Sequence, residues 1–330
     1  MPITDADLTP RFPRDPETAF FLAPQAAFGT PTYTGLQALH FTDFDPQKPR
    51  DPIQEREYGG ADVDGAIDQG EVVFGDITVT PPLKTNLCLN EIGFWLAYLL
   101  GAPTSTDLTG GRYQHVFTSG KSQLPIGTLL LQDPEGARVI DSCVVGSLAL
   151  AIAQGGGRQV CDFTTVARDM VQVPTATITA GVAAATAPPT RLFVPQKAWT
   201  VAMDGTNVGR LLSATLNYSA DIGTDRYVDG GDAIGASYVG DPTASLQVSL
   251  RHVNEAQRAL FDNENTAKAL TLTGTAAGNH SIAISLPQAK IPPVYSAKDD
   301  KLRSLSLTAT AERNNGSAMT ITLINSLASY

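Results

Sequence analysis

The sequence is poor in cysteine and in long apolar runs. Its three cysteines, Cys88, Cys143 and Cys161, are too few and too scattered for a disulfide framework, so we expect small buried side chains. The longest apolar stretch, residues 92–102, is much shorter than the roughly 20 residues that a membrane helix needs. The start has no basic segment followed by an apolar run, which predicts no secretory signal. We therefore expect synthesis in a cytoplasm and no membrane partner.

Charge is scarce, and its balance is acidic. Only 17% of residues are charged, and 23 Lys and Arg against 33 Asp and Glu give a formal net charge of −10. Proteins that hold nucleic acid tightly gather Lys and Arg against the phosphates. Any nucleic acid that meets this protein is therefore expected to be a passenger without specific binding.

Motifs of catalysis and metal binding are missing from the sequence. There is neither a G-x-S-x-G nucleophile elbow nor a G-x-x-x-x-G-K-[ST] phosphate loop. We predict no enzymatic activity, no cofactor and no metal site, because the four histidines are far apart and form no ligand pair: His40, His115, His252 and His280. Calcium stays open as an alternative at one acidic cluster whose spacing differs from the helix-loop-helix pattern: Asp62, Asp64, Asp68 and Glu71.

The sequence does contain long runs of two-residue alternation. Apolar side chains recur at every second position in five segments, which is the period of a strand with one buried face: 144–152, 212–218, 246–250, 282–286 and 305–311. Turn residues such as Asp204-Gly205 and Gly155-Gly156-Gly157 separate the strands. The alternation predicts a mainly β fold.

Two segments have helical spacing instead. Asn90 is expected to cap a helix whose apolar residues continue to Gly101, and Pro103 follows. A shorter helix with the same Asn-Glu start is predicted from Asn254 to Leu260. Trp95 in the first helix and Trp199 at a strand start are expected to pack in the core.

The order of the predicted elements occurs twice along the chain. Residues 22–28 (LAPQAAF) resemble residues 193–199 (FVPQKAW), and an Arg-containing, Gly-Gly-ended loop follows at 56–60 and at 226–231. We predict two tandem β-sandwich or rolled-barrel units, each with one flanking helix; the alternative is one large sandwich. The predicted organisation is an extended N-terminal arm (1–20), a first unit (21–174), a linker (175–191) and a second unit (192–330).

Several of these segments together resemble a known family. They are Ala27-Phe28-Gly29-Thr30, the helix at 90–101, the strand entry at 112–117, the strand at 146–150 before a glycine turn, and the terminal segment 321–325. The chain resembles the tail tube, or major tail, proteins of long-tailed bacteriophages. The resemblance implies tail-tube-like units in a structural virion protein that self-assembles into stacked rings around a continuous inner β-barrel, through which DNA passes at ejection.

The resemblance also implies partners and a ring symmetry. The implied partners are further copies of this chain and the tail terminator, tape measure and distal tail proteins. Six units around a ring correspond to three duplicated chains, so a trimer with pseudo-sixfold symmetry is expected, or a hexamer if the chain is not duplicated.

A polar strand face suits a water-filled lumen, and the strand at 302–313 has one. The candidate lumen-facing residues are Asp141, Ser147, Ser304, Ser306, Thr308, Thr310 and Glu312. We expect a negatively charged conduit, because a wall of the same sign as DNA denies the phosphates cationic contacts.

A long polar segment, residues 45–70, lies inside the first unit. It is too long to pack within a compact domain, so we expect it and the arm 1–19 to reach the next ring. Its candidate inter-ring residues are Arg50, Glu55, Arg56, Asp62 and Asp64.

The main alternative function is a carbohydrate-binding or adhesive β module. A module of that kind would have exposed aromatic residues on one face of a sheet.

Overall fold

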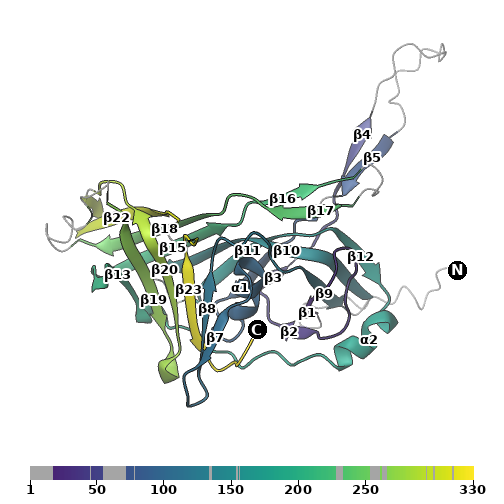
Figure 1. Cartoon of the computed structure of the whole chain (residues 1–330), viewed down its shortest axis with the longest axis horizontal. Coiled ribbons are helices and arrows are strands. Elements are labelled where there is room, and N and C mark those ends of the chain that lie inside the picture. The colour runs from purple at the N-terminus through teal and green to yellow at the C-terminus, as the bar shows by residue number, and fades with distance from the viewer. Residues whose placement is uncertain are drawn as a thin grey trace, which may run out of the picture.

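Antiparallel strands make up most of the chain, as the alternating sequence predicts (Figure 1). The computed structural model describes residues 18–44, 46–54, 72–77, 79–133, 136–153, 155, 157–227, 233–252, 261, 266–294, 296–299, 302–313 and 316–330. Within these residues the α-helices are α1 (Ile92–Leu100) and α2 (Thr175–Ala183), and short 3-10 turns occur at Gln196–Ala198 and Ala277–Asn279.

The strands of the first half are β1 (Ala19–Pro24), β2 (Gln37–Leu39), β3 (Asp43–Phe44), β4 (Arg50–Gln54), β5 (Val72–Ile77), β6 (Pro82–Asn86), β7 (Thr104–Asp107), β8 (Tyr113–Thr118), β9 (Gly127–Asp133), β10 (Gly136–Ala153), β11 (Val160–Val166) and β12 (Asp169–Val173). Those of the second half are β13 (Trp199–Met203), β14 (Thr206–Asn207), β15 (Leu211–Ser219), β16 (Ile222–Asp225), β17 (Ala236–Val239), β18 (Thr243–Arg251), β19 (Lys268–Thr275), β20 (Ser281–Lys290), β21 (Ser296–Asp299), β22 (Leu302–Ala311) and β23 (Thr320–Asn325).

One sheet runs without interruption from the first half of the chain into the second. We call it the long sheet, and its strand order is β3-β6-β11-β10-β15-β18-β22-β21. The pairing of β10 with β15 joins the two halves, and the pairing of β8 with β23 joins them a second time. The predicted units therefore share sheets and are not two separate sandwiches.

Two further strand layers close the barrel behind the long sheet. The first has the order β2-β1-β9-β10-β12, and the second has the order β14-β13-β19-β20-β23-β8-β7. A short pairing of β20 with the end of β22 links the second layer to the long sheet. The buried apolar residues of β6, β11, β15, β18 and β22 point into the space between these layers and form the main core.

Strand β10 belongs to two layers, and it changes direction between them. Its pairing register with β9 shifts between Ile140 and Cys143, and its register with β11 shifts between Val145 and Ser147. Ser142 has a φ of 52°, a left-handed conformation that is unusual for serine. These irregularities let one strand leave the first layer and enter the long sheet.

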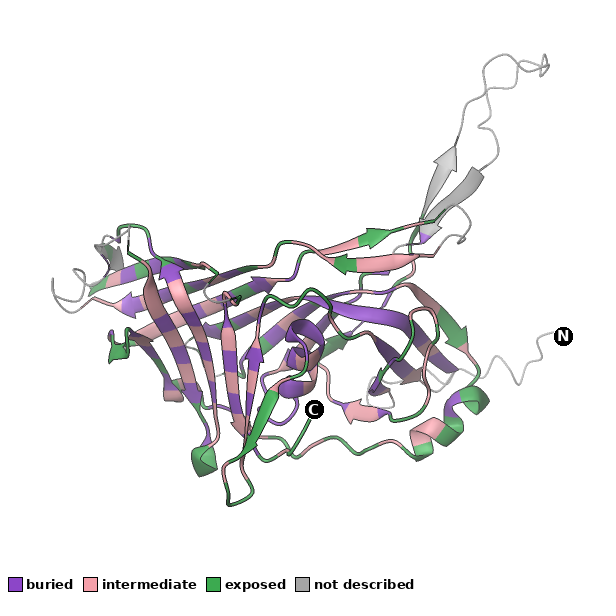
Figure 2. Cartoon of the chain, in the orientation of Figure 1, coloured by how far each residue is buried: buried purple, intermediate pink, exposed green. Residues whose placement is uncertain are grey.

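Helix α1 fills the core beneath the long sheet, where its Trp95 is 1% exposed (Figure 2). Trp95 stacks on Phe20 and lies against Phe163, so residues from β1, α1 and β11 meet at its ring. Trp199 is also buried, at the start of β13. Both tryptophans are therefore core residues, as predicted.

The first predicted helix is confirmed, but its predicted cap is wrong. Glu91 holds the N-cap position and makes no side-chain capping bond. The Asn90 amide donates to the Thr190 carbonyl and its oxygen accepts from the Ser326 backbone, so it ties the C-terminal segment to the middle of the chain. The second predicted helix, Asn254–Leu260, lies outside the described residues.

The segment predicted as a linker contains a helix that the sequence analysis did not predict. Helix α2 lies at 175–183 and covers a small second core through its single buried residue, Ile178. The predicted N-terminal arm lies outside the described residues up to position 17, and β1 begins at Ala19.

Candidate assembly surfaces

The outer face of the long sheet carries small polar side chains. Strand register places Ala149, Asn217, Ser245 and Thr310 side by side across β10, β15, β18 and β22. The same register aligns two further rows: Ala151, Thr215, Gln247 and Thr308, and then Ala153, Ser213, Ser249 and Ser306. All of these side chains are exposed or half-buried. The residues that alternate with them along each strand point to the other side of the sheet, and most of them are buried (Figure 2). We call this surface the polar face.

Five of the seven candidate lumen residues lie on the polar face. Antiparallel partners point to the same side of a sheet, and the register through β15 and β18 therefore places Ser147 on the same side as the β22 residues Ser304, Ser306, Thr308 and Thr310. The sixth candidate, Glu312, lies just beyond β22, where its carboxylate is 2.7 Å from the Lys290 ammonium.

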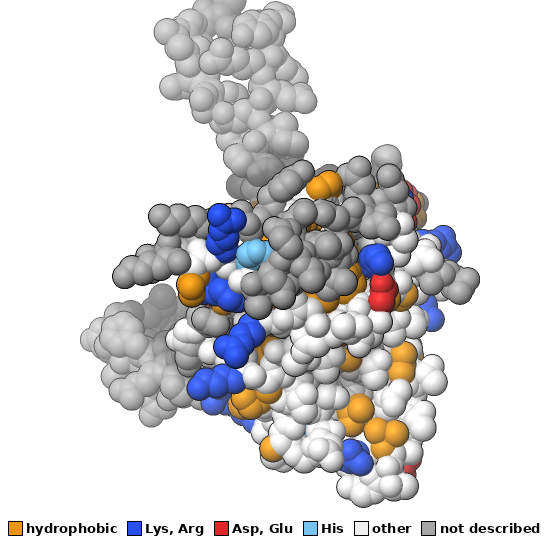
Figure 3. Space-filling view, turned by 90° about the vertical axis from the view of Figure 1, so that its left-hand side faces the viewer, with side chains coloured by type: hydrophobic (Ala, Val, Ile, Leu, Met, Phe, Trp, Pro, Cys, Tyr) orange, Lys and Arg blue, Asp and Glu red, His pale blue; other side chains and the backbone are white. Residues whose placement is uncertain are grey.

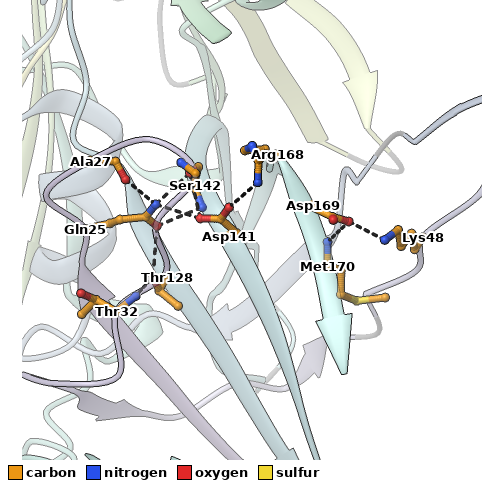
Figure 4. Close-up of polar contacts among 11 residues, drawn as sticks. Gln25, Ala27, Thr32, Lys48, Thr128, Asp141, Ser142, Arg168, Asp169 and Met170 are labelled. Carbon is orange, nitrogen blue, oxygen red and sulfur yellow. Dashed lines mark hydrogen bonds and ion pairs between the residues drawn. The ribbon is translucent and has the colours of Figure 1, made fainter. Parts of the chain in front are cut away.

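Asp141 lies in a different environment, at the bend of β10. It is 4% exposed, and its carboxylate accepts hydrogen bonds from the Gln25 amide at 2.8 Å and from the Ser142 hydroxyl at 2.9 Å (Figure 4). Its second oxygen is 3.1 Å from the Arg168 guanidinium. The Gln25 carbonyl accepts from the Ser142 backbone N–H and from the Thr128 hydroxyl. Because the chain itself satisfies this carboxylate, Asp141 is not on the polar face.

Few charged side chains lie on the polar face. Lys84 of β6 and Asp162 of β11 are directly opposite each other by register, and Arg251 lies at the far end of β18. The candidate positions on β10 and β22 are serine and threonine. This surface therefore offers hydroxyl, amide and methyl groups, and few cations that could hold a phosphate.

Both edges of the long sheet carry only short covering strands. β22 pairs with β21 over 302–305 and with β20 at 310–311, which leaves residues 306–309 without a partner on that side among the described strands. At the other edge, the two-residue strand β3 pairs with β6 and with no other described strand. Unpaired edge strands are the usual place at which another chain adds to a sheet.

Two hairpins project from one end of the long sheet. One is formed by β4 and β5 from the first half, the other by β16 and β17 from the second half (Figure 1). The Arg226 guanidinium donates to the Ile77 carbonyl, which ties the second hairpin to the base of the first. The Lys48 ammonium is 2.6 Å from the Asp169 carboxylate of β12 (Figure 4).

The predicted inter-ring segment, 45–70, is described only over residues 46–54, which include β4 of the first hairpin. Arg50 is exposed at the start of β4. The other candidates lie outside the described residues, as does the alternative calcium cluster: Glu55, Arg56, Asp62, Asp64, Asp68 and Glu71.

The comparison with known families decides what kind of protein carries these surfaces. A family model described as phage tail tube protein matches residues 16–311, which is most of the chain. The chain belongs to the phage tail tube protein family. No curated protein matches the sequence at a significant level.

Burial keeps two thiols and one phenol in the core of this tail tube protein neutral. Burial raises the pKa of the Cys143 thiol to about 12 and that of the Tyr218 phenol to about 12, and it raises the pKa of Cys161 well above its ordinary value. All three cysteines are free and buried, as predicted. Thiols in this environment are poor nucleophiles, which fits the structural role of the family.

The histidines of the tail tube protein have separate surroundings. His115 is fully buried between the Ser105 hydroxyl and the Leu327 carbonyl, and His40 contacts Glu91. Among the described residues, no three His, Cys, Asp or Glu side chains come together as a metal-binding group. Neither described helix is long and apolar enough to cross a bilayer.

Sequence reasoning missed three surface features of the tail tube protein. They are the β16–β17 hairpin, its exposed tyrosines Tyr227 and Tyr238, and the arginines at the opposite end of the long sheet. The only local signal for the hairpin is the Gly-Gly loop at 230–231, which the comparison of the two halves had already paired with the loop at 59–60.

Proposed function

We propose that copies of this chain close into rings through the edges of the long sheet. The long sheet ends at β3 on one side and on the other at β22 with its short partner β21, so each copy can present one edge to each neighbour. Pairing them around a circle removes the unpaired backbone groups and forms a continuous barrel.

In this ring the polar face lines the lumen and DNA passes along it. The observation that carries the proposal is the set of rows across β10, β15, β18 and β22, in which alanines of β10 align with small polar side chains of the other three strands, opposite an apolar inner face. A neutral hydroxyl-rich wall gives phosphates little to bind. The lumen proposed here is therefore closer to neutral than the net charge of −10 suggested, and Asp141 is not part of it.

Rings of three chains are the stoichiometry that we favour. Each half of the chain has a projecting hairpin, β4–β5 or β16–β17, which supports the internal duplication and hence six similar units in a trimer. A hexamer of single units is the alternative.

We further propose that the segment 45–70 and the arm 1–19 reach the adjacent ring, and that the tube ends meet the tail terminator, tape measure and distal tail proteins. In this role the chain is a structural part of the virion tail and has no catalytic function. The β4–β5 hairpin supports the proposal, because its paired strands project away from the body of the chain (Figure 1).

Electron microscopy of the purified chain tests the proposal directly. We expect rings or tubes, with three chains in each ring by image symmetry and mass measurement. The variant Thr308→Lys should assemble normally, yet its tubes should retain DNA that wild-type tubes release, with Thr200→Lys, at an exposed site on β13, as the matched control. Monomers that bind glycans would instead favour the adhesive β module.

A further inference from the structure

The β16–β17 hairpin exposes two large aromatic side chains. Tyr227 is 50% exposed and Tyr238 is 59% exposed. The rings of these tyrosines lie over Gly235 and Gly223 of the same hairpin, where an added side chain would collide with them. Tyrosines held in a fixed position and left open to solvent are typical of interface centres.

Acidic side chains surround these tyrosines. Asp221, Asp225 and Asp241 are all exposed at the base and along the strands of the hairpin. The β16–β17 hairpin therefore carries two exposed tyrosines and three exposed aspartates, while its Arg226 guanidinium donates to the Ile77 carbonyl.

Three arginines lie at the opposite end of the long sheet. Arg210 precedes β15, Arg251 ends β18 and Arg303 lies at the start of β22. The Arg251 backbone N–H donates to the Arg210 carbonyl, and the His252 N–H donates to the Arg303 carbonyl, so these arginines occupy neighbouring strands. Leu302, 58% exposed, lies beside them. We call this surface the arginine end, and Figure 3 shows Lys and Arg side chains gathered on this side of the molecule.

The two ends cannot meet within one chain. Strand β15 runs from the arginine end at Leu211 to the hairpin end at Ser219, and nine residues of strand span about 30 Å. Any contact between them therefore joins two copies.

We propose that the β16–β17 hairpin of one copy docks on the arginine end of a copy in the next ring. The proposal rests on the tube function proposed above, and it adds a second axial contact and its receiving surface. Aspartates pair with the arginines, and the tyrosine rings cover Leu302 and the planar guanidinium groups. Because the two ends differ in charge, every ring stacks in the same direction.

Charge reversal at an exposed arginine tests this contact. Arg210→Glu should form normal rings, but the protein concentration needed for tubes should rise about tenfold, because attraction becomes repulsion at every ring junction. Lys121→Glu is the matched control: it is exposed on the loop between β8 and β9, makes the same charge change, and should form tubes as the wild type does.

The reciprocal variant identifies the partner surface. Asp225→Lys should also impair stacking, and Arg210→Glu combined with Asp225→Lys should restore tubes. Normal stacking of Arg210→Glu, or no recovery in the combined variant, would overturn the docking while the tube function stands. A wild-type chain that forms neither rings nor tubes would overturn the tube function itself.

Discussion

Strand β10 has two halves with opposite surroundings. In the first half, up to Val145, nearly every residue is buried, because Ala137 and Val139 face the small core beneath α2 while Ile140 and Cys143 face the main core. In the second half, from Ser147, burial alternates strictly, with the odd-numbered residues exposed or half-buried. The same strand is thus covered on both sides in one layer and on one side in the other.

The difference in burial between the two halves of β10 distinguishes the part of the strand that supports the fold from the part whose outer face is available for function. Where a helix covers the sheet, apolar residues are buried on both faces of the strand, and the strand supports the fold. Where no described segment covers the sheet, the outer residues of β10 are serine and alanine, whose small side chains need no cover. A face of this kind across several strands is available for the lumen that we propose.

The largest expected effect comes from the covered face of the second half. Leu150 is 1% exposed in the main core, so Leu150→Ala should lower the free energy of unfolding by about 3 kcal/mol. Val160→Ala is the matched control on the outer face of β11, opposite Ala151, and should cost less than about 1 kcal/mol. Urea unfolding measures both, and equal losses would contradict the assignment of the two faces.

The junction between the halves should be nearly as sensitive. Asp141→Ala leaves the Gln25 amide, the Ser142 hydroxyl and the Arg168 guanidinium without their acceptor, and should cost about 2 kcal/mol because Arg168 is partly solvated. Asp162→Ala, on the polar face, is the control and should change stability by less than about 0.5 kcal/mol. If both variants unfold at the wild-type urea concentration, the network does not brace the bend.

The smallest effect, taken over a single pH unit, is an alkaline loss of stability. Below the ordinary thiol pKa of 9.0 both the folded and unfolded states keep the Cys143 proton, so pH has no effect through this group. Between pH 9 and 12 only the unfolded thiol ionises, so stability should fall with rising pH by about 1.4 kcal/mol per pH unit. Cys143→Ala should show a shallower alkaline fall, and identical slopes would contradict a buried neutral thiol.

The strands were predictable because their signal is local. Alternation over 144–152, 212–218, 246–250, 282–286 and 305–311 identified β10, β15, β18, β20 and β22, and the helical spacing after residue 90 identified α1. The cap of α1 was not predictable, because the Asn90 side chain bonds to Ser326 and Thr190, far away in the sequence. Helix α2 was missed because alanine and threonine around prolines are as typical of a connector as of a short helix.

The candidate surface was partly predictable for the same reason. The alternation of β22 separates its polar positions from its apolar ones without any knowledge of the fold, and the strand register puts these polar positions on the same face of the long sheet as Ser147. Asp141 has the polarity of an outer residue, but the register shift after Ile140 and the Gln25 amide place it inside. The arginine end has no sequence signature, because Arg210, Arg251 and Arg303 meet only through strand pairing.

The sequence by itself determined the mainly β character, the α1 helix and the two chemically distinct sides of each long strand, since these follow from the spacing of neighbouring residues. Only the tertiary structure decided which side each strand leaves uncovered and which charged residues gather at each end. Those outcomes depend on the register between strands far apart in the chain, such as β8 with β23 and β10 with β15. A shift of one residue in that register would turn every polar side chain of a strand toward the core.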